Sequence, residues 1–203
     1  LDSDDNDYRT FIIYLITAIQ KVFPGKLKRT EALVNVPELP DNKSIVHSLI
    51  NELDQIGKNF ILVLDDYHLI RNDSIHLLID ELLCYPPENF HLCMITRRDP
   101  PLRIDSLRAH GRMIEIRMSE LTFSEEEVIE LFFKRHGIKL ERPVATSLQK
   151  KTEGWITALQ LVSLALKNKP NIEKELALFS GDLITLSDFL VREILSGLSD
   201  DMK

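Results

Sequence analysis

The first regular pattern in the sequence is a hydrophobic stripe with helical spacing. Four apolar residues fall on one face of residues 7–23: Phe11, Leu15, Ala18 and Val22. A proline and a glycine then interrupt the pattern, so the sequence predicts a helix over 7–23. Residues 24–41 contain three prolines and little periodicity, which predicts mostly loop. A second stripe follows over 42–56, with Asp41 placed to cap that helix.

The period then changes from helical to the short apolar runs that are typical of strands. Residues 60–64 read Phe-Ile-Leu-Val-Leu, and residues 90–95 form a second such run. Continuous apolar runs of this length predict strands buried on both faces of a parallel sheet. A helix is predicted between them over 73–84, and a third strand with some alternation over 112–117. Strand, helix and strand at these spacings predict an α/β fold.

After residue 122 the pattern is helical. Ser124 and Glu127 form a Ser-x-x-Glu capping box, so a helix is predicted to about residue 135. Pro143 suits the first turn of a helix over 143–151, and Gly154 precedes another helical stripe. Four residues share the face of that stripe: Trp155, Leu159, Val162 and Leu166. Toward the end of the chain, the pattern predicts a weaker helix or a turn over 169–182 and a last helix over 187–197.

Composition and charge narrow the classes of protein that this chain can be. Of its 203 residues, 44% are hydrophobic and 28% are charged, which suits a folded domain with a buried core. The net charge of −7 argues against nucleic-acid binding as the main role of the chain, because such binding needs a positive surface. Residues 97–117 carry six arginines. In so acidic a chain, we expect them to form a phosphate-facing or solvated loop rather than a nucleic-acid patch.

The cysteines and the apolar runs bear on the protein's compartment. Cys84 and Cys93 fit neither a disulfide framework nor a zinc site, so we expect half-buried thiols in a reducing cytosol. The sequence has no run of about 18 apolar residues, so we expect no membrane partner. These observations predict a cytoplasmic location.

Charged residues follow the two best-defined strands. Asp65 and Asp66 come directly after the first strand, and Arg97 and Arg98 follow the second. In a parallel sheet the carboxyl ends of the strands line the ligand crevice. Four apolar residues followed by a carboxylate form the Walker B pattern, in which the carboxylate serves Mg²⁺ and a cation on the adjacent strand reaches the γ-phosphate. The alternative is that both strands end in polar residues because loops are hydrated.

The phosphate-binding half of such a site is missing from the sequence. A P-loop requires GxxxxGKS or GxxxxGKT, whose backbone amides hold the phosphates. The Gly-Lys pairs at 25–26 and 57–58 are followed by Leu27 and Asn59, and neither has the required preceding glycine. Either the chain holds no nucleotide site, or it is a piece of one.

Four segments, in order, resemble the nucleotide-binding domain of the MalT-type, large ATP-binding LuxR-family transcriptional regulators. These regulators belong to the STAND class of P-loop ATPases. The segments are FILVLDDYHLI, ITRRDPPL, LTFSEEEVIELF and GWITALQLVSLAL. The opening LDSDDNDYRTFIIYLITAIQ also resembles the family, so the resemblance covers nearly the whole chain.

The resemblance implies roles for the residues at the strand ends. Asp65 would be the Walker B residue that holds Mg²⁺ through water, and Asp66 would be its acidic neighbour in catalysis. Arg97 would sense the γ-phosphate, whereas Arg98 has no family role. In the lid, Gly154 and Trp155 match the family's nucleotide-proximal GW motif. The alternative for the tryptophan is a core aromatic.

The resemblance also implies a partial P-loop core, a parallel sheet with flanking helices, followed by an all-helical lid. Residues 1–122 would form the nucleotide-binding core without its Walker A segment, 123–182 the lid, and 183–203 the start of a winged-helix region. The phosphate-binding loop would lie before residue 1, so we expect the chain to be a piece of a longer protein.

In that parent protein, the resemblance implies that ATP and Mg²⁺ control self-association, with hydrolysis as a slow reset. A C-terminal domain outside this chain would bind DNA. We expect the chain alone to bind no cofactor and to be inactive as an ATPase, because the phosphate-binding loop is absent. The alternative is a non-enzymatic interaction module with a degenerate nucleotide site.

The family's strand order also implies a gap in the sheet. The phosphate-loop strand would lie between the strand that precedes Arg97 and the strand over 112–117. Without it, backbone N–H and C=O groups lack partners on both sides. We therefore expect residues 112–117 to pair with residues 90–95 or with another chain, rather than to detach.

Overall fold

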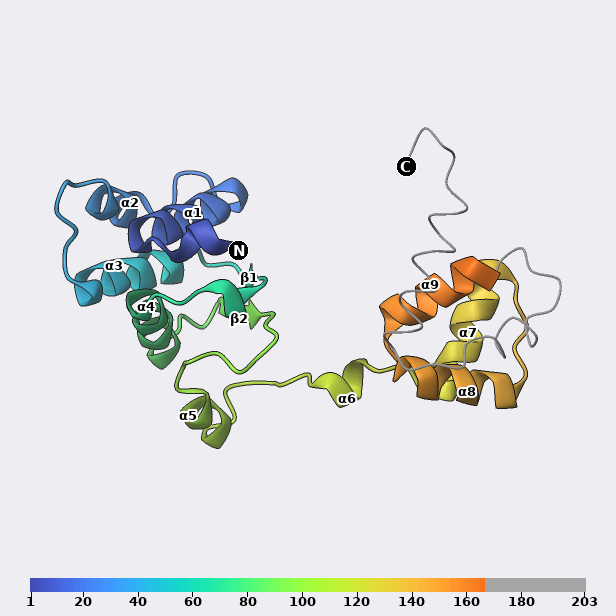
Figure 1. The fold of residues 1–203 in the computed structure, drawn as a ribbon. Coiled ribbons are helices and arrows are strands. Elements are labelled where there is room, and N and C mark those ends of the chain that lie inside the picture. Colours follow the sequence, from blue (N-terminus) through green and yellow to red (C-terminus); the bar gives the residue numbers. More distant parts are fainter. Residues whose placement is uncertain (167–203) are drawn as a thin grey trace. The chain divides into compact units, whose positions relative to one another are not determined.

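The computed structural model describes residues 1–166, which belong to two compact units. The first unit is Leu1–Ile114 and the second is Glu115–Lys203. Each unit has its own buried core, and the first contains a parallel sheet (Figure 1). Three expectations lie outside the described residues: a helix or turn over 169–182, a helix over 187–197, and a winged-helix region over 183–203. None of the helices in residues 1–166 has both the length and the apolar composition needed to cross a bilayer.

The three long helices of the first unit form where the sequence predicts them, but two residues of the predicted first stripe, Ala18 and Val22, are exposed. Their bounds are α1, Tyr8–Val22; α3, Asn42–Asp54; and α4, Asp73–Cys84. A short 3₁₀ helix, η1, precedes them over Ser3–Asn6. Asp7 caps α1 by accepting a hydrogen bond from the backbone N of Thr10 at 2.8 Å. As predicted, Asp41 caps α3, accepting from the backbone N of Ser44 at 2.9 Å.

Part of the segment predicted to be loop between the first two helices is helical. Helix α2 runs over Lys28–Val34, and no neighbouring side chain caps it. Instead Glu52 of α3 accepts hydrogen bonds from the backbone N of Arg29 at 3.0 Å and of Thr30 at 2.8 Å. The carboxylate satisfies amides that a helix N-terminus otherwise leaves unpaired. Because this cap comes from a distant residue, the local sequence shows no sign of the helix.

The sheet consists of two parallel strands, β1 (Phe60–Leu64) and β2 (Phe90–Met94), paired in register from Phe60 with Phe90 onward. Helices α1 to α4 lie on one side of it (Figure 1), where Leu62 is buried in the shared core. On the opposite face, Ile61 is 65% exposed and Val63 is 53% exposed. The expectation of strands buried on both faces is therefore wrong, because the helices of this unit cover only one face.

The predicted third strand does not form in the described chain. Residues 112–117 make no strand, and Ile114 is 94% exposed. Pairing of this segment with β2 is therefore wrong, whereas pairing with another chain stays a prediction. Alternating apolar and charged residues favour a strand, but a strand forms only where a partner supplies hydrogen bonds. Two short helices flank the segment: α5, Ile104–Ala109, and α6, Met118–Leu121.

The two cysteines differ in exposure. Cys84, at the end of α4, is half-buried as expected, and its Sγ accepts a hydrogen bond from Arg103 at 3.1 Å. Cys93 is exposed on the open face of β2, opposite Val63 in the register. The expectation of a half-buried thiol is wrong for Cys93, for the same reason that it is wrong for this face of the sheet.

The second unit contains three packed helices: α7, Glu125–His136; α8, Arg142–Thr152; and α9, Ile156–Leu166. The predicted capping box is present, since the carboxylate of Glu127 accepts from the backbone N of Ser124 at 2.8 Å. Gly137 ends α7 in the left-handed region with φ of 67°, and Pro143 lies in the first turn of α8. Phe132 and neighbouring aliphatic residues of all three helices form the core.

Candidate functional site

The carboxyl ends of β1 and β2 are joined by backbone hydrogen bonds. The N–H of Ile95 donates to the carbonyl of Leu64 at 2.9 Å, and the N–H of Tyr67 donates to the carbonyl of Ile95 at 3.1 Å. Asp65 and Asp66 lie between these two anchored points. The parallel register therefore brings both carboxylates to the same edge of the sheet as the arginine pair after β2.

The two aspartates have different local geometry. Asp65 is exposed, and its Oδ1 accepts a hydrogen bond from the backbone N of Asp66 at 2.9 Å. Asp66 has φ of 54°, in the left-handed region, where Asp is among the better tolerated residues. It precedes the 3₁₀ helix η2 (Tyr67–Leu69), and its Oδ1 lies 3.7 Å from Nδ1 of His68. The first carboxylate is thus oriented by the backbone of the second while it stays open to solvent.

The exposed carboxylate edge suits one kind of metal ion. Mg²⁺ keeps several waters and is usually bound by one or two carboxylates together with phosphate oxygens. In residues 1–166, no three His, Cys, Asp or Glu side chains are grouped so that they could hold a metal ion by themselves. Two carboxylates alone would need further ligands to bind Mg²⁺, and Asp65 is the better oriented of the two.

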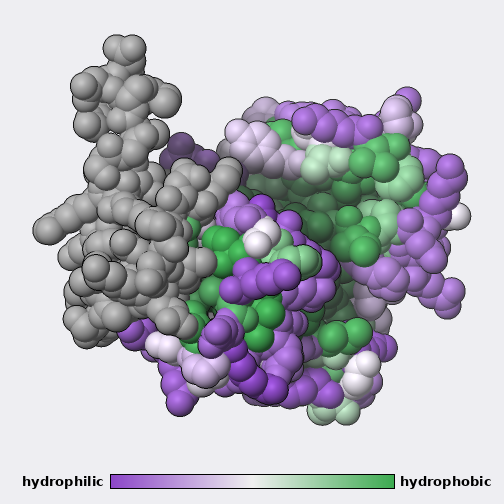
Figure 2. Space-filling model, turned by 90° about the vertical axis from the view of Figure 1, so that its right-hand side faces the viewer, coloured by the Kyte–Doolittle hydropathy of each residue, from purple (hydrophilic) through white to green (hydrophobic). Residues whose placement is uncertain are grey.

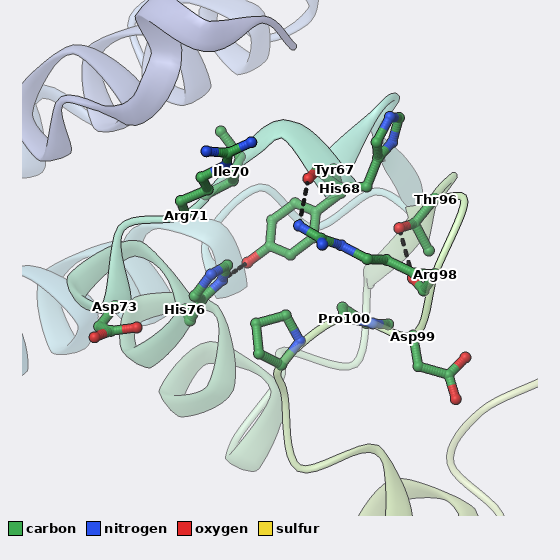
Figure 3. Close-up of a pocket in the computed structure, with 11 residues that line it drawn as sticks. Tyr67, His68, Ile70, Arg71, Asp73, His76, Thr96, Arg98, Asp99 and Pro100 are labelled. Carbon is green, nitrogen blue, oxygen red and sulfur yellow. Dashed lines mark hydrogen bonds between the residues drawn. The ribbon is translucent and has the colours of Figure 1, made fainter.

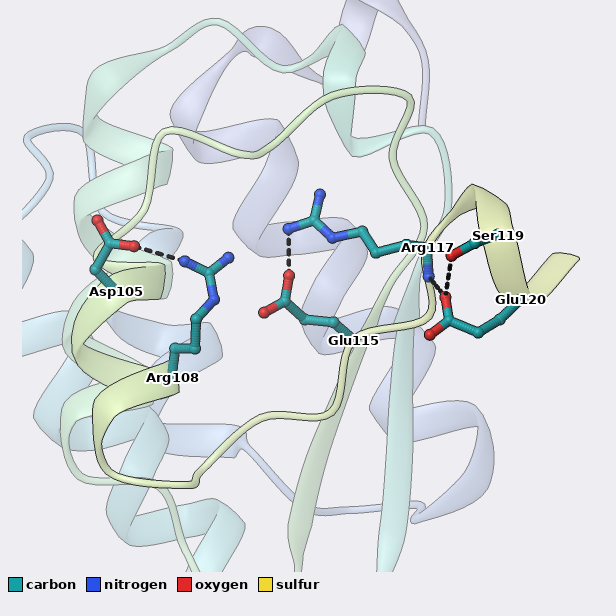
Figure 4. A network of polar contacts seen from close by, with 6 residues as sticks. All are labelled: Asp105, Arg108, Glu115, Arg117, Ser119 and Glu120. Atoms are coloured by element: carbon teal, nitrogen blue, oxygen red, sulfur yellow. Dashed lines mark hydrogen bonds and ion pairs between the residues drawn. The ribbon is translucent and has the colours of Figure 1, made fainter.

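The six arginines of residues 97–117 are not equivalent. Five of them make side-chain contacts: Arg98, Arg103, Arg108, Arg112 and Arg117. Figure 4 shows two of these contacts, the ion pairs of Arg108 with Asp105 and of Arg117 with Glu115. Arg97 is exposed and has no hydrogen bond or ion pair with any described residue. Among the six arginines of this segment, only Arg97 thus has a guanidinium that binds no other group within residues 1–166.

A cavity of about 410 Å³ lies beside the strand ends (Figure 3). Its walls come from the segment after β1, the first turns of α4 and the loop after β2. Thr96, Arg98 and Pro100 line it, whereas Arg97 and the two aspartates do not. The residues predicted to serve Mg²⁺ and the γ-phosphate therefore lie on the edge of the sheet, outside this cavity.

The cavity is also lined by a buried pair that the sequence analysis missed. The hydroxyl of Tyr67 and Nδ1 of His76 are 2.8 Å apart, and the two rings make an edge-to-face contact. Burial lowers the pKa of His76, against the opposing effect of Asp73 and Asp80. Burial, with a smaller effect of Asp80, raises the pKa of Tyr67. One sequence signal was available, because a histidine on the buried stripe of α4 requires a polar partner.

The Gly-Trp pair lies in the second unit, where packing accounts for the glycine. Gly154 has φ of 71°, and a Cβ there would lie 2.7 Å from the backbone O and 2.8 Å from the backbone N of Phe123. The N–H of Phe123 also donates to the carbonyl of Gly154 at 2.9 Å. Trp155 is 42% exposed, so the core-aromatic alternative is wrong. It precedes α9, and the rest of its predicted stripe is buried without it.

The chain is similar over its whole length to part of a known class of regulator. It is 35% identical to the HTH-type transcriptional regulator MalT of Yersinia enterocolitica, across 100% of this chain and 23% of that protein. The MalT regulators of Yersinia pestis and Yersinia pseudotuberculosis are 36% identical, across 96% of this chain and 22% of theirs. No family model matches the chain. The chain therefore spans less than a quarter of the length of the MalT regulators that it resembles.

Proposed function

We propose that this chain is part of the ATP-binding region of a MalT-type transcriptional regulator. The observation that carries the proposal is the in-register parallel pairing of β1 and β2, which brings Asp65, Asp66 and Arg97 to one edge of the sheet. The similarity to MalT regulators along the whole chain supports the same class. The phosphate-binding amides would come from another part of the longer protein, since no P-loop sequence stands in residues 1–203.

Each residue of the edge has a role that follows from its chemistry. Asp65 would orient the water ligands of Mg²⁺, and Asp66 would position the water that attacks the γ-phosphate. Arg97 would donate charge-assisted hydrogen bonds to the γ-phosphate oxygens. Bound Mg²⁺ would supply charge neutralisation on the phosphates. The free guanidinium and the exposed, oriented carboxylate support these roles, because neither is needed to hold the fold.

In the longer protein, ATP would act as a switch for self-association. The helices of the second unit would serve as a lid, with Gly154 and Trp155 near the nucleotide. The second unit has a buried core of its own, which supports a separate helical subdomain. DNA would be bound by a different part of the regulator.

Nucleotide titration of the full-length protein that contains this chain tests the proposal. Asp65→Asn should abolish the Mg²⁺ dependence of ATP binding and lower turnover by about 100-fold, because the metal loses its protein ligand. Arg97→Gln should weaken ATP binding by about tenfold and leave ADP binding unchanged, because its partner is the terminal phosphate. The matched controls are Asp54→Asn and Arg135→Gln. Both side chains are exposed and make no hydrogen bond or ion pair with a described residue.

Two results would overturn these assignments. An equal loss of ATP and ADP affinity in Arg97→Gln would remove the γ-phosphate role. Absence of Mg-ATP binding by the wild-type protein would remove the nucleotide site itself.

The open face of the sheet favours the second candidate, an interaction module whose nucleotide site is degenerate. Ile61 and Val63 expose apolar surface on this face of β1, and Ile95 is exposed just beyond the end of β2. Exposed apolar surface commonly marks an interface. Figure 2 shows hydrophobic residues, in green, at the surface on the side in view. For this candidate, Ile61→Asp should reduce self-association of the full-length protein by sedimentation, while Asp65→Asn should leave it unchanged.

A further inference from the structure

Arg98, for which the resemblance gives no role, links the two strand ends. Its Nη2 donates to the carbonyl of His68 at 3.1 Å, which joins residues thirty positions apart. Figure 3 shows the side chain reaching back from the loop after β2 toward the segment of Tyr67 and His68. The contact therefore connects the loop after β2 to the turn that follows Asp65 and Asp66.

This tether lies beyond the last backbone hydrogen bond of the sheet. Within the described chain, the contact from the Tyr67 N–H to the Ile95 carbonyl is the last that backbone atoms make between the two segments. Thr96 adds a local restraint, since its hydroxyl donates to the carbonyl of Arg98 at 2.7 Å. The side chains of Thr96 and Arg98 thus extend the order of the sheet into the loop that carries Arg97.

The two neighbouring arginines separate at a bend of the backbone after β2. Thr96 and Arg98 line the cavity, whereas Arg97 does not. The backbone bends at Arg97 and Arg98, and the contacts of Thr96 and Arg98 restrain this bend, so the position of the Arg97 side chain depends on them. We infer that Arg98 is a positioning residue, which fixes the guanidinium of Arg97 relative to Asp65 and Asp66.

The effect of Arg98 on nucleotide binding rests on the proposed function. The hydrogen bond between Arg98 and His68 does not depend on it. If Arg98 positions Arg97, its loss should widen the range of positions that the Arg97 guanidinium samples. Recognition of a γ-phosphate depends on that position, whereas contacts to the rest of the nucleotide do not. Loss of Arg98 should therefore lower the preference for ATP over ADP without lowering affinity for ADP.

The first experiment measures hydrogen exchange of the 203-residue chain without nucleotide. Arg98→Gln should speed exchange of the Tyr67 and Leu69 amides by about threefold or more, because the turn loses a restraint. The matched control is Arg97→Gln, which removes the neighbouring guanidinium and should leave these rates unchanged. Unchanged exchange in Arg98→Gln would overturn the tether, as would equal acceleration in peptides of α1.

The second experiment measures ATP and ADP binding by the full-length protein. Arg98→Gln should lower the ratio of ATP to ADP affinity by about three- to tenfold, and Arg98→Lys should restore part of it, because an ammonium still donates to one carbonyl. Thr96→Val should lower the ratio less. An equal loss of both affinities, together with a lower melting temperature, would show a merely structural role and overturn the inference.

The two proposals fail in different ways. If Arg97→Gln leaves the affinity ratio unchanged, the γ-phosphate role of Arg97 is wrong, whatever Arg98 does. If Arg97→Gln lowers the ratio and Arg98→Gln does not, the proposed function stands and the positioning role is wrong.

Discussion

The two units of the chain hold their motif residues for different physical reasons. In the first unit, Asp65 and Arg97 lie where the backbone hydrogen bonds of a sheet end, and neither side chain fills the core. In the second unit, Gly154 stands where the backbone of Phe123 leaves no room for a Cβ. Asp65 and Arg97 are therefore open to a ligand, whereas packing alone explains the glycine at position 154. Similar motif matches therefore differ in how strongly they point to function.

The cores of the two units also differ in the elements that form them. The core of the first unit combines α1 to α4 with one face of the sheet, and the other face stays open. Among residues up to 166, the core of the second unit is formed by three helices and the connection between α7 and α8. Each core is continuous within its own unit, so the comparison predicts that the two units respond to mutation separately.

The largest effects should come from matched core truncations, one in each unit. Leu78→Ala in α4 and Leu148→Ala in α8 should each lower the free energy of unfolding by about 2–5 kcal/mol, because each removes a fully buried side chain. Hydrogen exchange should accelerate only within the unit that carries the change. Leu77→Ala is the control, since its side chain is 56% exposed. Equal acceleration in both units would break the comparison by showing one cooperative fold.

The next largest effect should separate packing from backbone conformation in the second unit. Gly154→Ala should cost about 2–4 kcal/mol, because it combines a left-handed φ with contacts to Phe123 that no Cβ tolerates. Gly137→Ala, with a similar φ and nothing within 4 Å, should cost only about 1 kcal/mol. Thermal denaturation of the two variants measures the difference. Equal costs would mean that close approach is not what requires Gly154.

A smaller effect is expected from the cap that one helix of the first unit provides for another. Glu52→Ala should lower the free energy of unfolding by about 1–2 kcal/mol, because the amides of Arg29 and Thr30 lose their acceptor. The exposed Glu38→Ala is the control and should change it by less than about 0.5 kcal/mol. A neutral Glu52→Ala would show that α2 does not depend on this distant cap.

The same contacts predict a pH dependence of the first unit. Burial raises the pKa of Glu52, but hydrogen bonds from Thr30 and Arg29 outweigh it and lower the pKa below its ordinary value of 4.5. Below pH 4.5 the unfolded state therefore binds protons more readily than the folded state. The contribution of Glu52 is complete above that pH and is lost as the pH falls through the lowered value. In acid titrations of stability, Glu52→Gln should remove this step.

The smallest effect should come from the open face of the sheet. Val63→Thr should change the free energy of unfolding by less than about 0.5 kcal/mol, because that side chain is 53% exposed. Leu62→Thr, on the adjacent buried position of the same strand, should cost at least about 2 kcal/mol. Urea denaturation of the two variants compares the faces directly. A large cost for Val63→Thr in the 203-residue chain would contradict an open face.

Elements with local signals were predictable, and elements that depend on distant partners were not. Asp41, Ser124 and Gly137 mark helix ends through contacts within a few residues, so the sequence alone located those ends. Helix α2 is capped by Glu52, more than twenty residues away, and was therefore missed. Residues 112–117 have the alternation of a strand, but no strand within residues 1–166 pairs with them.

The candidate site was predictable to the same extent. Apolar runs that end in charge placed Asp65 and the arginine pair on one edge, and the parallel register confirms that placement. What each side chain contacts was not predictable, because Arg97 and Arg98 are chemically identical neighbours. Only the fold shows that Arg98 is bound to His68 and that Arg97 is not. The pairing of Tyr67 with His76 was equally invisible, since it depends on where α4 packs.

The exposure of Cys93 provides a natural chemical footprint of the open sheet face. Its thiol stands beside Val63 in the strand register, whereas Cys84 is half-buried against Arg103. A water-soluble alkylating reagent should therefore label Cys93 first, and the rate of labelling depends on access to that face. Any segment or partner that covers β1 and β2 shields the thiol. Mass spectrometry of the alkylated protein therefore shows, without an engineered probe, whether this face of the sheet is covered in a given assembly.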